Sequence, residues 1–270
     1  MHGGLLLLDV ESNEDLELIK NSLNELLIRE WSSFGAKKHE VSREKVLDLF
    51  NKFKELGVFQ FIKETSLTNA LIINELLGEN LLPGIIATTA MLGVESPATL
   101  GANYVPEADK AEIILSPKGI AYKDEVELIE VDSPDPSIKM FKIINGNWKA
   151  SDLDFNKAML MASAQIIGHG VACMKEAIEY AKTRTTFGKP IGSYQAIKHR
   201  IVDDVISLEL VRSRYLSNPK DAQSIFKHAY RKALKSILNS IQIHGGIGFT
   251  ADLDLHLHLK RVIALEKIFH

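Results

Sequence analysis

The sequence has very little cysteine: Cys173 is the one thiol among 270 residues. A single cysteine excludes a disulfide bond within the chain. Cys173 lies in an apolar helical pattern close to Val171 and Met174. We therefore expect a buried, unreactive thiol rather than a nucleophile.

The sequence also lacks a block of like charge and a long hydrophobic run. The net charge is −3, and no basic stripe or polybasic patch points to nucleic acid or to a membrane surface. The longest apolar stretch, 81–94, is interrupted by proline and glycine and is too short to span a bilayer. The run Leu5–Leu8 is too short for a signal-peptide core. We expect a cytoplasmic protein with no membrane insertion and no nucleic-acid partner.

Hydrophobic residues make up 46% of the chain, which is enough for a sizeable core. In the first third of the sequence they recur every three to four positions, which predicts helices. The expected helices are residues 13–31, with Ser12 or Asn13 as the cap; Val46 to a stop at Gly57; and Leu71 to Leu77, ended by Gly78.

The composition and the apolar pattern of the sequence change between residues 96 and 150. Five prolines and several turn clusters separate short apolar runs there, which predicts a small β-region of four or five strands. The runs are 111–115, 126–131 and 140–144.

Apolar stripes at helical spacing return after residue 151. They run from Leu160 to Ile178, from Ile197 to Val211 and from Ile225 to Ile241, which predicts antiparallel helices buried along one face. Gly168 and Gly170 lie inside the first stripe, where glycine costs about 1 kcal/mol relative to alanine. We therefore expect a neighbouring helix to approach closely at these glycines.

The segment from Arg184 to Gln195 combines an arginine, an aromatic residue and glycines between two helical stripes. Arg184 can pair with a diphosphate in bidentate fashion, and Phe187 can pack against a flat ring. A plain loop between helices with a surface arginine explains the same residues equally well.

The segment from Gln242 to Thr250, called the glycine segment below, contains the adjacent Gly245 and Gly246. Their bare backbone can approach a phosphate or a flat ring closely. Taken alone, a helix cap followed by a tight turn is the favoured interpretation. No strand precedes the glycines, so this is no dinucleotide-binding fingerprint.

His256 and His258 have a spacing that could bind a metal on a strand. No Asp, Glu or Cys is spaced to complete such a site convincingly. We expect no metal and interpret the two histidines as a surface or interface pair.

Together, residues 180–199 and 242–250 resemble the two signatures of the acyl-CoA dehydrogenases, a family of flavoproteins, in their order and at about their separation. The resemblance is strong from about 155 to 261 and weak before. It implies a mainly α fold with an N-terminal helical domain (1–95), a reduced β-domain (96–150) and a C-terminal four-helix bundle (151–270). It also implies that Leu253–Leu259, which alternates like a strand, is a loop entering a helix.

The resemblance implies FAD as the cofactor, acyl-CoA as the substrate and an electron-transfer flavoprotein as the acceptor. In this family the bundle of one subunit reaches the flavin held by its neighbour. The family reaction is α,β-dehydrogenation, in which a glutamate removes the α-proton and the β-hydride passes to the flavin. By position, the expected cofactor-binding residues are Arg184, Thr186, Phe187, Ile191, Gln195, Gln242, Gly245 and Gly246.

The sequence departs from the family at the catalytic base. The two positions that hold a base in different members carry Phe269 and, on the first bundle helix, about Ala158. Glu266 is the acid nearest to Phe269, and we favour a solvated or ion-paired glutamate over a substitute base. The segment that precedes the strands holding the flavin ring in this family, called the flavin-ring segment below, is reduced to fragments within 93–103. The usual tail after the base position is missing.

These departures resemble heteromeric members, in which one subunit holds the flavin ring and the base and a shorter sister completes the FAD site. Such members include enzymes for bulky CoA thioesters such as steroid side chains, and residues 255–261 look most like that subgroup. The leading hypothesis is a heterotetramer subunit paired with a longer acyl-CoA dehydrogenase. Two alternatives stay open: a homo-oligomeric acyl-CoA dehydrogenase with Glu266 as an atypical base, and a flavin-free structural subunit.

Overall fold

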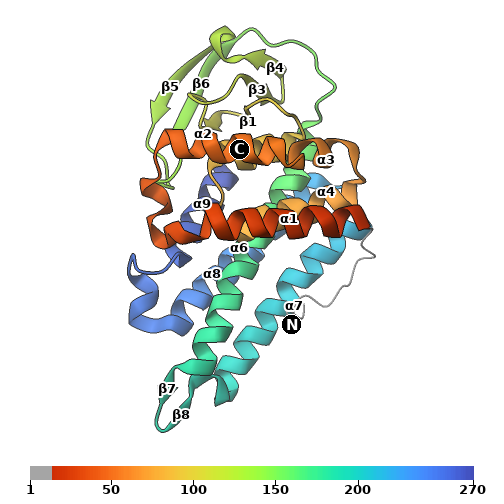
Figure 1. Ribbon diagram of the computed structural model, residues 1–270. Helices are drawn as coiled ribbons and strands as arrows, with labels where there is room; N and C mark the ends of the chain where they lie inside the picture. Colours follow the sequence, from red (N-terminus) through yellow and green to blue (C-terminus); the bar gives the residue numbers. More distant parts are fainter. Residues whose placement is uncertain (1–13) are drawn as a thin grey trace.

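The computed structural model describes residues 14–270, and its N-terminal part is helical, as the apolar spacing predicts (Figure 1). The elements are α1 (Glu14–Glu30), the 3₁₀ segment η1 (Ser32–Glu40), α2 (Arg43–Glu55), α3 (Val58–Glu64), α4 (Leu67–Glu79) and α5 (Gly84–Leu92). Leu5–Leu8 and the expected caps Ser12 and Asn13 lie outside the described residues.

Local signals explain where these helices begin and end. The side chains of Ser42 and Ser66 cap α2 and α4 by accepting hydrogen bonds from backbone N–H groups three residues later. Gly57 adopts a φ of 76°, which lets the chain leave α2 and turn into α3. The predicted stop at Gly57 is therefore confirmed.

The tightest helix contact joins α4 to α6 (Phe155–Thr183). A Cβ on Gly78 would lie 2.1 Å from the carbonyl oxygen of Gln165, and a Cβ on Gly168 would lie 2.1 Å from that of Glu75. The close approach expected at Gly168 is confirmed. The prediction that Gly78 ends its helix is wrong, because α4 continues to Glu79 and Gly78 serves this packing.

The β-region consists of two three-stranded sheets at one end of the molecule (Figure 1). The first has the order β1-β3-β4, with β1 parallel to β3, and the second has the antiparallel order β2-β6-β5. The strands are β1 (Ala98–Leu100), β2 (Tyr104–Pro106), β3 (Ile113–Ser116), β4 (Gly119–Tyr122), β5 (Val126–Val131) and β6 (Met140–Gly146). The region thus holds six strands rather than four or five, because β1 and β2 are too short to show a sequence period.

The C-terminal part is a bundle of α6, α7 (Gln195–Ser217), α8 (Ala222–His244) and α9 (Leu255–Ile268). Because α9 begins at Leu255, the alternating run at Leu253–Leu259 enters a helix, as the resemblance implied. Gly170 of α6 faces Ala233 of α8, so the second close approach is also confirmed. One hydrophobic cluster contains residues from the N-terminal helices and the bundle. The division into three domains at 95 and 150 stays a prediction.

Two further sequence-based expectations bear on the bundle. Cys173 is fully buried in α6, and burial raises the pKa of its thiol well above the usual value, in agreement with an unreactive side chain. Among residues 14–270, no helix has the length and apolar character needed to cross a membrane.

Candidate functional site

The segment from Arg184 to Gln195, called the hairpin segment below, forms a two-stranded projection between α6 and α7 (Figure 1). Arg184 caps the C-terminus of α6, and β7 (Thr185–Thr186) pairs with β8 (Lys189–Pro190). Phe187 at the tip is 92% exposed and has a φ of 52°. A positive φ is a strained conformation for a bulky residue, and here it holds an aromatic ring out in solvent.

Hydrogen bonds fix this projection to the start of α7. Ile191 N donates to the carbonyl oxygen of Arg184 at 2.8 Å, and the Tyr194 hydroxyl donates to that of Thr186 at 3.0 Å. Gln195, the first residue of α7, is exposed beside them. The predicted residues Arg184, Thr186, Ile191 and Gln195 therefore lie on one ordered turn.

The glycine segment lies where α8 ends and the 3₁₀ segment η4 (Gly245–Phe249) begins. Gly245 has a φ of 63°, and an added Cβ on Gly245 or Gly246 would meet no atom within 4 Å. Their backbone therefore faces open space. Gln242 is exposed just before them, and Phe249 is 77% exposed just after.

Packing between α6 and α8 brings the two segments to the same end of the bundle. The rings of Tyr180 and His244 stack with centroids 4.5 Å apart. Ile243 is buried against Ala177 and Ala181, and Ile191 packs on the same cluster. Tyr180 lies one turn before Arg184 and His244 directly precedes Gly245, so this stack links both predicted parts of the site.

The side chains at this end suit a large, flat, anionic group. In the described part of the chain, no carboxylate pairs with the Arg184 guanidinium, which leaves its fork of donors available for a diphosphate. The uncovered backbone at Gly245 and Gly246 and the exposed Phe187 add amide donors and an aromatic surface. These residues fit the diphosphate and ring parts of a dinucleotide such as FAD.

The two family positions for a catalytic base lie at the other end of α6 and hold apolar side chains. Phe269 packs between Phe155 and Phe226, at ring distances of 5.3 and 4.9 Å, and Ala158 is buried. Glu266 Oε1 lies 3.0 Å from His270 Nε2, a contact that is an ion pair only when the imidazole is protonated. A solvated or paired glutamate is the interpretation favoured from the sequence. This end of the bundle presents no carboxylate at either base position.

The fragments of the flavin-ring segment make hydrogen bonds to the end of α9. Ala102 N donates to the carbonyl oxygen of Ile268 at 2.7 Å, and Asn103 Nδ2 donates to that of His270 at 3.0 Å. These two donors are therefore already used within the chain.

The long helix α6 separates the predicted cofactor-binding residues from the predicted base positions. Ala158 and Arg184 lie 26 positions apart along α6 and its cap, which corresponds to about 39 Å at 1.5 Å per residue. Figure 1 shows the hairpin at the end of the bundle remote from the β-region. The predicted cofactor-binding residues and the predicted base positions of one chain therefore do not form one site.

The surface position expected for His258 is wrong, and His169 was not predicted as a site residue. His258 is 5% exposed, and its Nδ1 lies 2.9 Å from Nδ1 of His169, which is 2% exposed on α6. The surface-pair interpretation is therefore wrong for His258, whereas His256 is half-buried with Nδ1 2.8 Å from the Leu253 carbonyl oxygen. The available signal was His169, a histidine inside an otherwise apolar stripe.

Burial governs the protonation of this histidine pair. It lowers the pKa of His258 to about 3 and that of His169 well below its usual value. Both rings are therefore neutral at pH 7. No group of three or more His, Cys, Asp or Glu side chains within residues 14–270 is arranged to hold a metal ion.

Comparisons with known proteins cover the region that holds the two segments. Residues 148–267 match the family model described as the acyl-CoA dehydrogenase C-terminal domain. Over 226 residues the chain is 27% identical to acyl-CoA dehydrogenase IpdE2 of Mycobacterium tuberculosis, a match that covers 72% of this chain and 71% of that protein. IpdE2 of Mycolicibacterium smegmatis is 37% identical over 109 residues, 38% of this chain and 35% of that protein.

Solved structures share the fold over nearly the whole chain. Butyryl-CoA dehydrogenase from Megasphaera elsdenii matches with a TM-score of 0.76 and 13% identity, over 96% of this chain and 95% of that chain. The ChsE4–ChsE5 complex from Mycobacterium tuberculosis matches with a TM-score of 0.73 and 14% identity, over 96% of this chain and 94% of that chain. At these identities the likeness concerns the fold.

Proposed function

We infer that the chain belongs to the acyl-CoA dehydrogenase family of oxidoreductases acting on CH–CH groups, because residues 148–267 match the model of its C-terminal domain and solved members share the fold of nearly the whole chain. From this premise we propose that the chain is a subunit of an FAD-dependent acyl-CoA dehydrogenase and completes the FAD site of a partner subunit. The proposed substrate is an acyl-CoA thioester, and the proposed electron acceptor is an electron-transfer flavoprotein.

The separation between the two ends of α6 carries this proposal. The residues suited to FAD face outward at one end, while the base positions at the other end hold Phe269 and Ala158, about 39 Å away. That separation is longer than an extended dinucleotide. A flavin that contacts Arg184 therefore does its chemistry beside the residues of another chain.

In the assembled enzyme, the residues of this chain bind and orient the cofactor. Arg184 would pair with the diphosphate, Phe187 would pack on the adenosine part, and the backbone at Gly245 and Gly246 would allow a close approach. Thr186, Ile191, Gln195 and Gln242 line the same region. FAD supplies the hydride acceptor for the dehydrogenation, and the partner supplies the carboxylate base.

An exposed apolar face supports a partner subunit. Val202, Ile206 and Leu210 of α7 recur every four residues and are 52%, 46% and 67% exposed. A helix stripe of this kind is typical of an interface. ChsE4–ChsE5, one of the structures with this fold, is itself a complex of two named proteins, which favours a heteromer over a homo-oligomer.

Flavin retention in the assembled complex tests the proposal. We would co-express the chain with a longer acyl-CoA dehydrogenase homologue and measure bound FAD by absorbance. Arg184→Ala should weaken FAD binding about tenfold or more, because a charge-assisted pair is lost. Arg231→Ala, a change of the same type at an exposed position of α8, should keep the wild-type flavin content. Unchanged FAD in the Arg184 variant would reject the half-site.

A second variant separates the proposal from the homo-oligomeric alternative. Glu266→Gln should leave turnover by the complex unchanged, because Glu266 is paired with His270 and lies at no base position. Loss of turnover with FAD retained would instead identify Glu266 as the base. A complex that keeps FAD and activity after both Arg184 and Gln242 are replaced would favour the flavin-free scaffold.

A further inference from the structure

The turn at the tip of the hairpin segment is unfavourable for its own sequence. Thr186 of β7 pairs with Lys189 of β8, so Phe187 and Gly188 form a two-residue turn. Both have a positive φ, of 52° and 78°. A turn with two positive φ values favours Asn, Asp or Gly at its first central position. Phenylalanine is strained there, and at 92% exposure its ring gains little packing in return.

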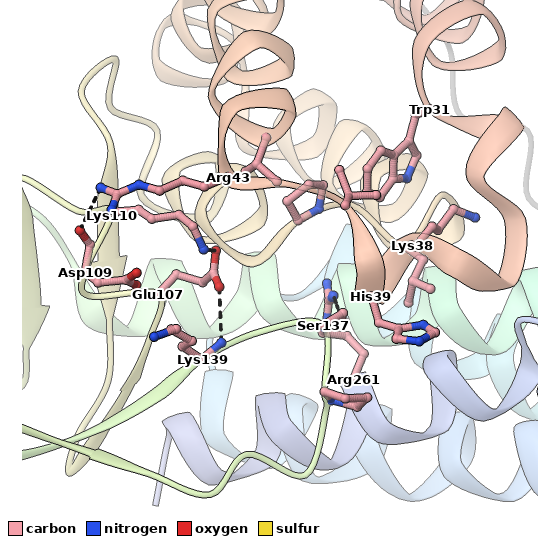
Figure 2. A pocket seen from close by; sticks show the side chains of 15 residues that line it. Trp31, Lys38, His39, Arg43, Glu107, Asp109, Lys110, Ser137, Lys139 and Arg261 are labelled. Carbon is pink, nitrogen blue, oxygen red and sulfur yellow. Dashed lines mark hydrogen bonds and ion pairs between the residues drawn. The ribbon is translucent and has the colours of Figure 1, made fainter.

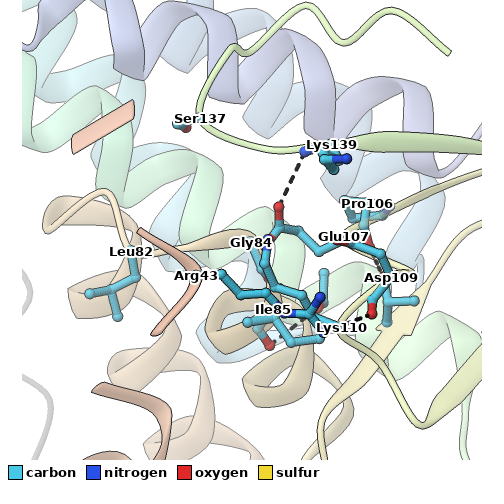
Figure 3. Close-up of polar contacts among 12 residues, drawn as sticks. Arg43, Leu82, Gly84, Ile85, Pro106, Glu107, Asp109, Lys110, Ser137 and Lys139 are labelled. Atoms are coloured by element: carbon cyan, nitrogen blue, oxygen red, sulfur yellow. Dashed lines mark hydrogen bonds and ion pairs between the residues drawn. The ribbon is translucent and has the colours of Figure 1, made fainter. Parts of the chain in front are cut away.

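Two other residues show how such strain is held elsewhere in the molecule. Among residues 14–270, the non-glycine residues with a positive φ are Phe187, Leu81 and Glu107. Leu81 and Glu107 line a pocket where η1 and α2 meet the loops of the β-region, and both are buried (Figure 2). The Glu107 carboxylate also accepts from Lys110 Nζ at 2.6 Å and from the Lys139 backbone N–H at 3.2 Å (Figure 3). The exposed Phe187 has no such enclosure.

The strands of the hairpin are too short to hold this turn by themselves. Each contains two residues, and even a longer isolated hairpin is only marginally stable in water. The backbone bond from Ile191 N to the Arg184 carbonyl oxygen closes the base of the hairpin rather than its tip. The tip therefore depends on a contact from outside the two strands.

Tyr194 supplies such a contact to both strands. Its hydroxyl donates to the Thr186 carbonyl oxygen on β7 at 3.0 Å. Nζ of Lys189 on β8 lies over the Tyr194 ring, 4.4 Å from the ring centroid, in a cation–π contact. Thr186 and Lys189 directly flank the strained turn. One side chain thus joins the two strands at the place where the strain lies.

The backbone at Tyr194 is fixed to the bundle. Tyr194 N donates to the Ile191 carbonyl oxygen, and Ile197 N donates to the Tyr194 carbonyl oxygen where α7 begins, both at 3.1 Å. Ile191 packs on the buried cluster that links α6 to α8. The ring of Tyr194 is therefore anchored outside the hairpin that it holds.

We propose that Tyr194 is a positioning residue for FAD. Its hydroxyl and its ring hold the strained turn closed, so that Phe187 and Arg184 are in place before the cofactor arrives. Only the closed conformer is competent to bind, so a larger closed fraction raises the apparent affinity. This role rests on the proposed FAD half-site, and Tyr194 acts through the turn rather than through a contact with the cofactor.

Hydrogen exchange of the purified full chain tests the closure without FAD or a partner. Tyr194→Phe removes the hydroxyl and keeps the ring. The amides of residues 184–195 should exchange about fivefold faster, because one hydrogen bond that opposes opening is lost. The melting temperature should stay the same, whereas a merely structural tyrosine would lower it. Tyr122→Phe, at an exposed position of β4, should change neither quantity. Unchanged exchange in Tyr194→Phe would overturn the proposal.

A second change in the turn should rescue the closure. Adding Phe187→Asn to Tyr194→Phe should slow the exchange back to about the wild-type rate, because Asn followed by Gly is the preferred pair in such a turn. Exchange that stays fast in the double variant would show that Tyr194 does not oppose the strain at Phe187, and would also overturn the proposal.

Titration of FAD into the complex with a longer homologue, after removal of bound flavin, tests the positioning role. Tyr194→Phe should weaken FAD binding about threefold to fivefold, and Tyr194→Ala about tenfold, because the second contact is lost as well. Tyr122→Phe should keep the wild-type affinity. If Arg184→Ala weakens FAD binding and Tyr194→Phe does not, the half-site stands and the positioning role is wrong. If neither variant weakens it, both proposals are wrong.

Discussion

At the scale of single residues, the hydrogen-bonded pair His169 and His258 makes the stability of the fold depend on pH. With the two Nδ1 atoms 2.9 Å apart, one ring donates and the other accepts, so the accepting ring cannot be protonated at Nδ1 without breaking the bond. The nearby charges of Lys38 and Arg261 oppose protonation of His258, and Asp135 only partly offsets them. Desolvation is the larger cause of the lowered pKa values.

We predict that this pair destabilises the fold as pH falls. An unfolded histidine titrates near pH 6.5, whereas the pKa of His258 is about 3 in the folded chain. Below about pH 6.5 the unfolded state binds more protons than the folded state, so stability falls as pH decreases toward 3. The loss is about 1.4 kcal/mol per pH unit for each buried histidine.

Urea unfolding at two pH values measures this effect. In His258→Gln, the drop in unfolding free energy between about pH 7.5 and about pH 5.5 should be smaller than in the wild type by about 1 kcal/mol. His199→Gln, at an exposed position of α7, should keep the wild-type drop. An unchanged pH dependence in the His258 variant would show that this ring is protonated without cost.

At the scale of elements, α7 and α8 could be predicted because each keeps a polar face and shows the three- to four-residue spacing of a one-sided helix. In α6 every residue from Ala158 to Val171 is buried, so the one-sided burial expected for this helix holds only toward its ends. All nine residues of α5 are buried, so the sequence shows no alternation there and the helix was not predicted. β1 and β2, at three residues each, are too short to carry a period.

The candidate site could also be predicted only in part. Both segments could be found because each is continuous in sequence, and Gly245 and Gly246 stand out locally. Their proximity depends on Tyr180 stacking on His244, a contact that no spacing reveals.

The α4–α6 contact predicts a strong effect from one added methyl group. In Gly168→Ala, the new Cβ would lie 2.1 Å from the backbone oxygen of Glu75, which cannot rotate away. The unfolding free energy should fall by about 1–3 kcal/mol or more, although alanine favours a helix over glycine. Lys157→Ala puts an alanine at an exposed position of α6 and should stay within about 0.5 kcal/mol of the wild type. A Gly168 variant as stable as the wild type would mean that the two helices can separate freely.

At the scale of the whole molecule, a buried polar network ties the N-terminal helices to the bundle. Arg212 Nε of α7 lies 3.1 and 3.0 Å from the two carboxylate oxygens of Glu75 on α4. The Tyr215 hydroxyl donates to the same carboxylate at 2.7 Å. All three side chains are buried, so removing Glu75 or Arg212 leaves the other charge uncompensated, which costs about 3–5 kcal/mol.

This network and the shared hydrophobic cluster predict that the helical parts unfold together. In a Trp148→Phe background, Trp31 reports on the N-terminal helices alone, while far-ultraviolet circular dichroism reports mostly on the bundle. The two urea transitions should coincide. Arg212→Met should shift both by the same amount, equivalent to about 3–5 kcal/mol, whereas the exposed-site change Arg231→Met should shift neither by more than about 0.5 kcal/mol. If Trp31 reported an earlier transition than the dichroism in the wild type, residues before the β-region would form an independent folding unit, and Glu75–Arg212 would join two domains rather than one core.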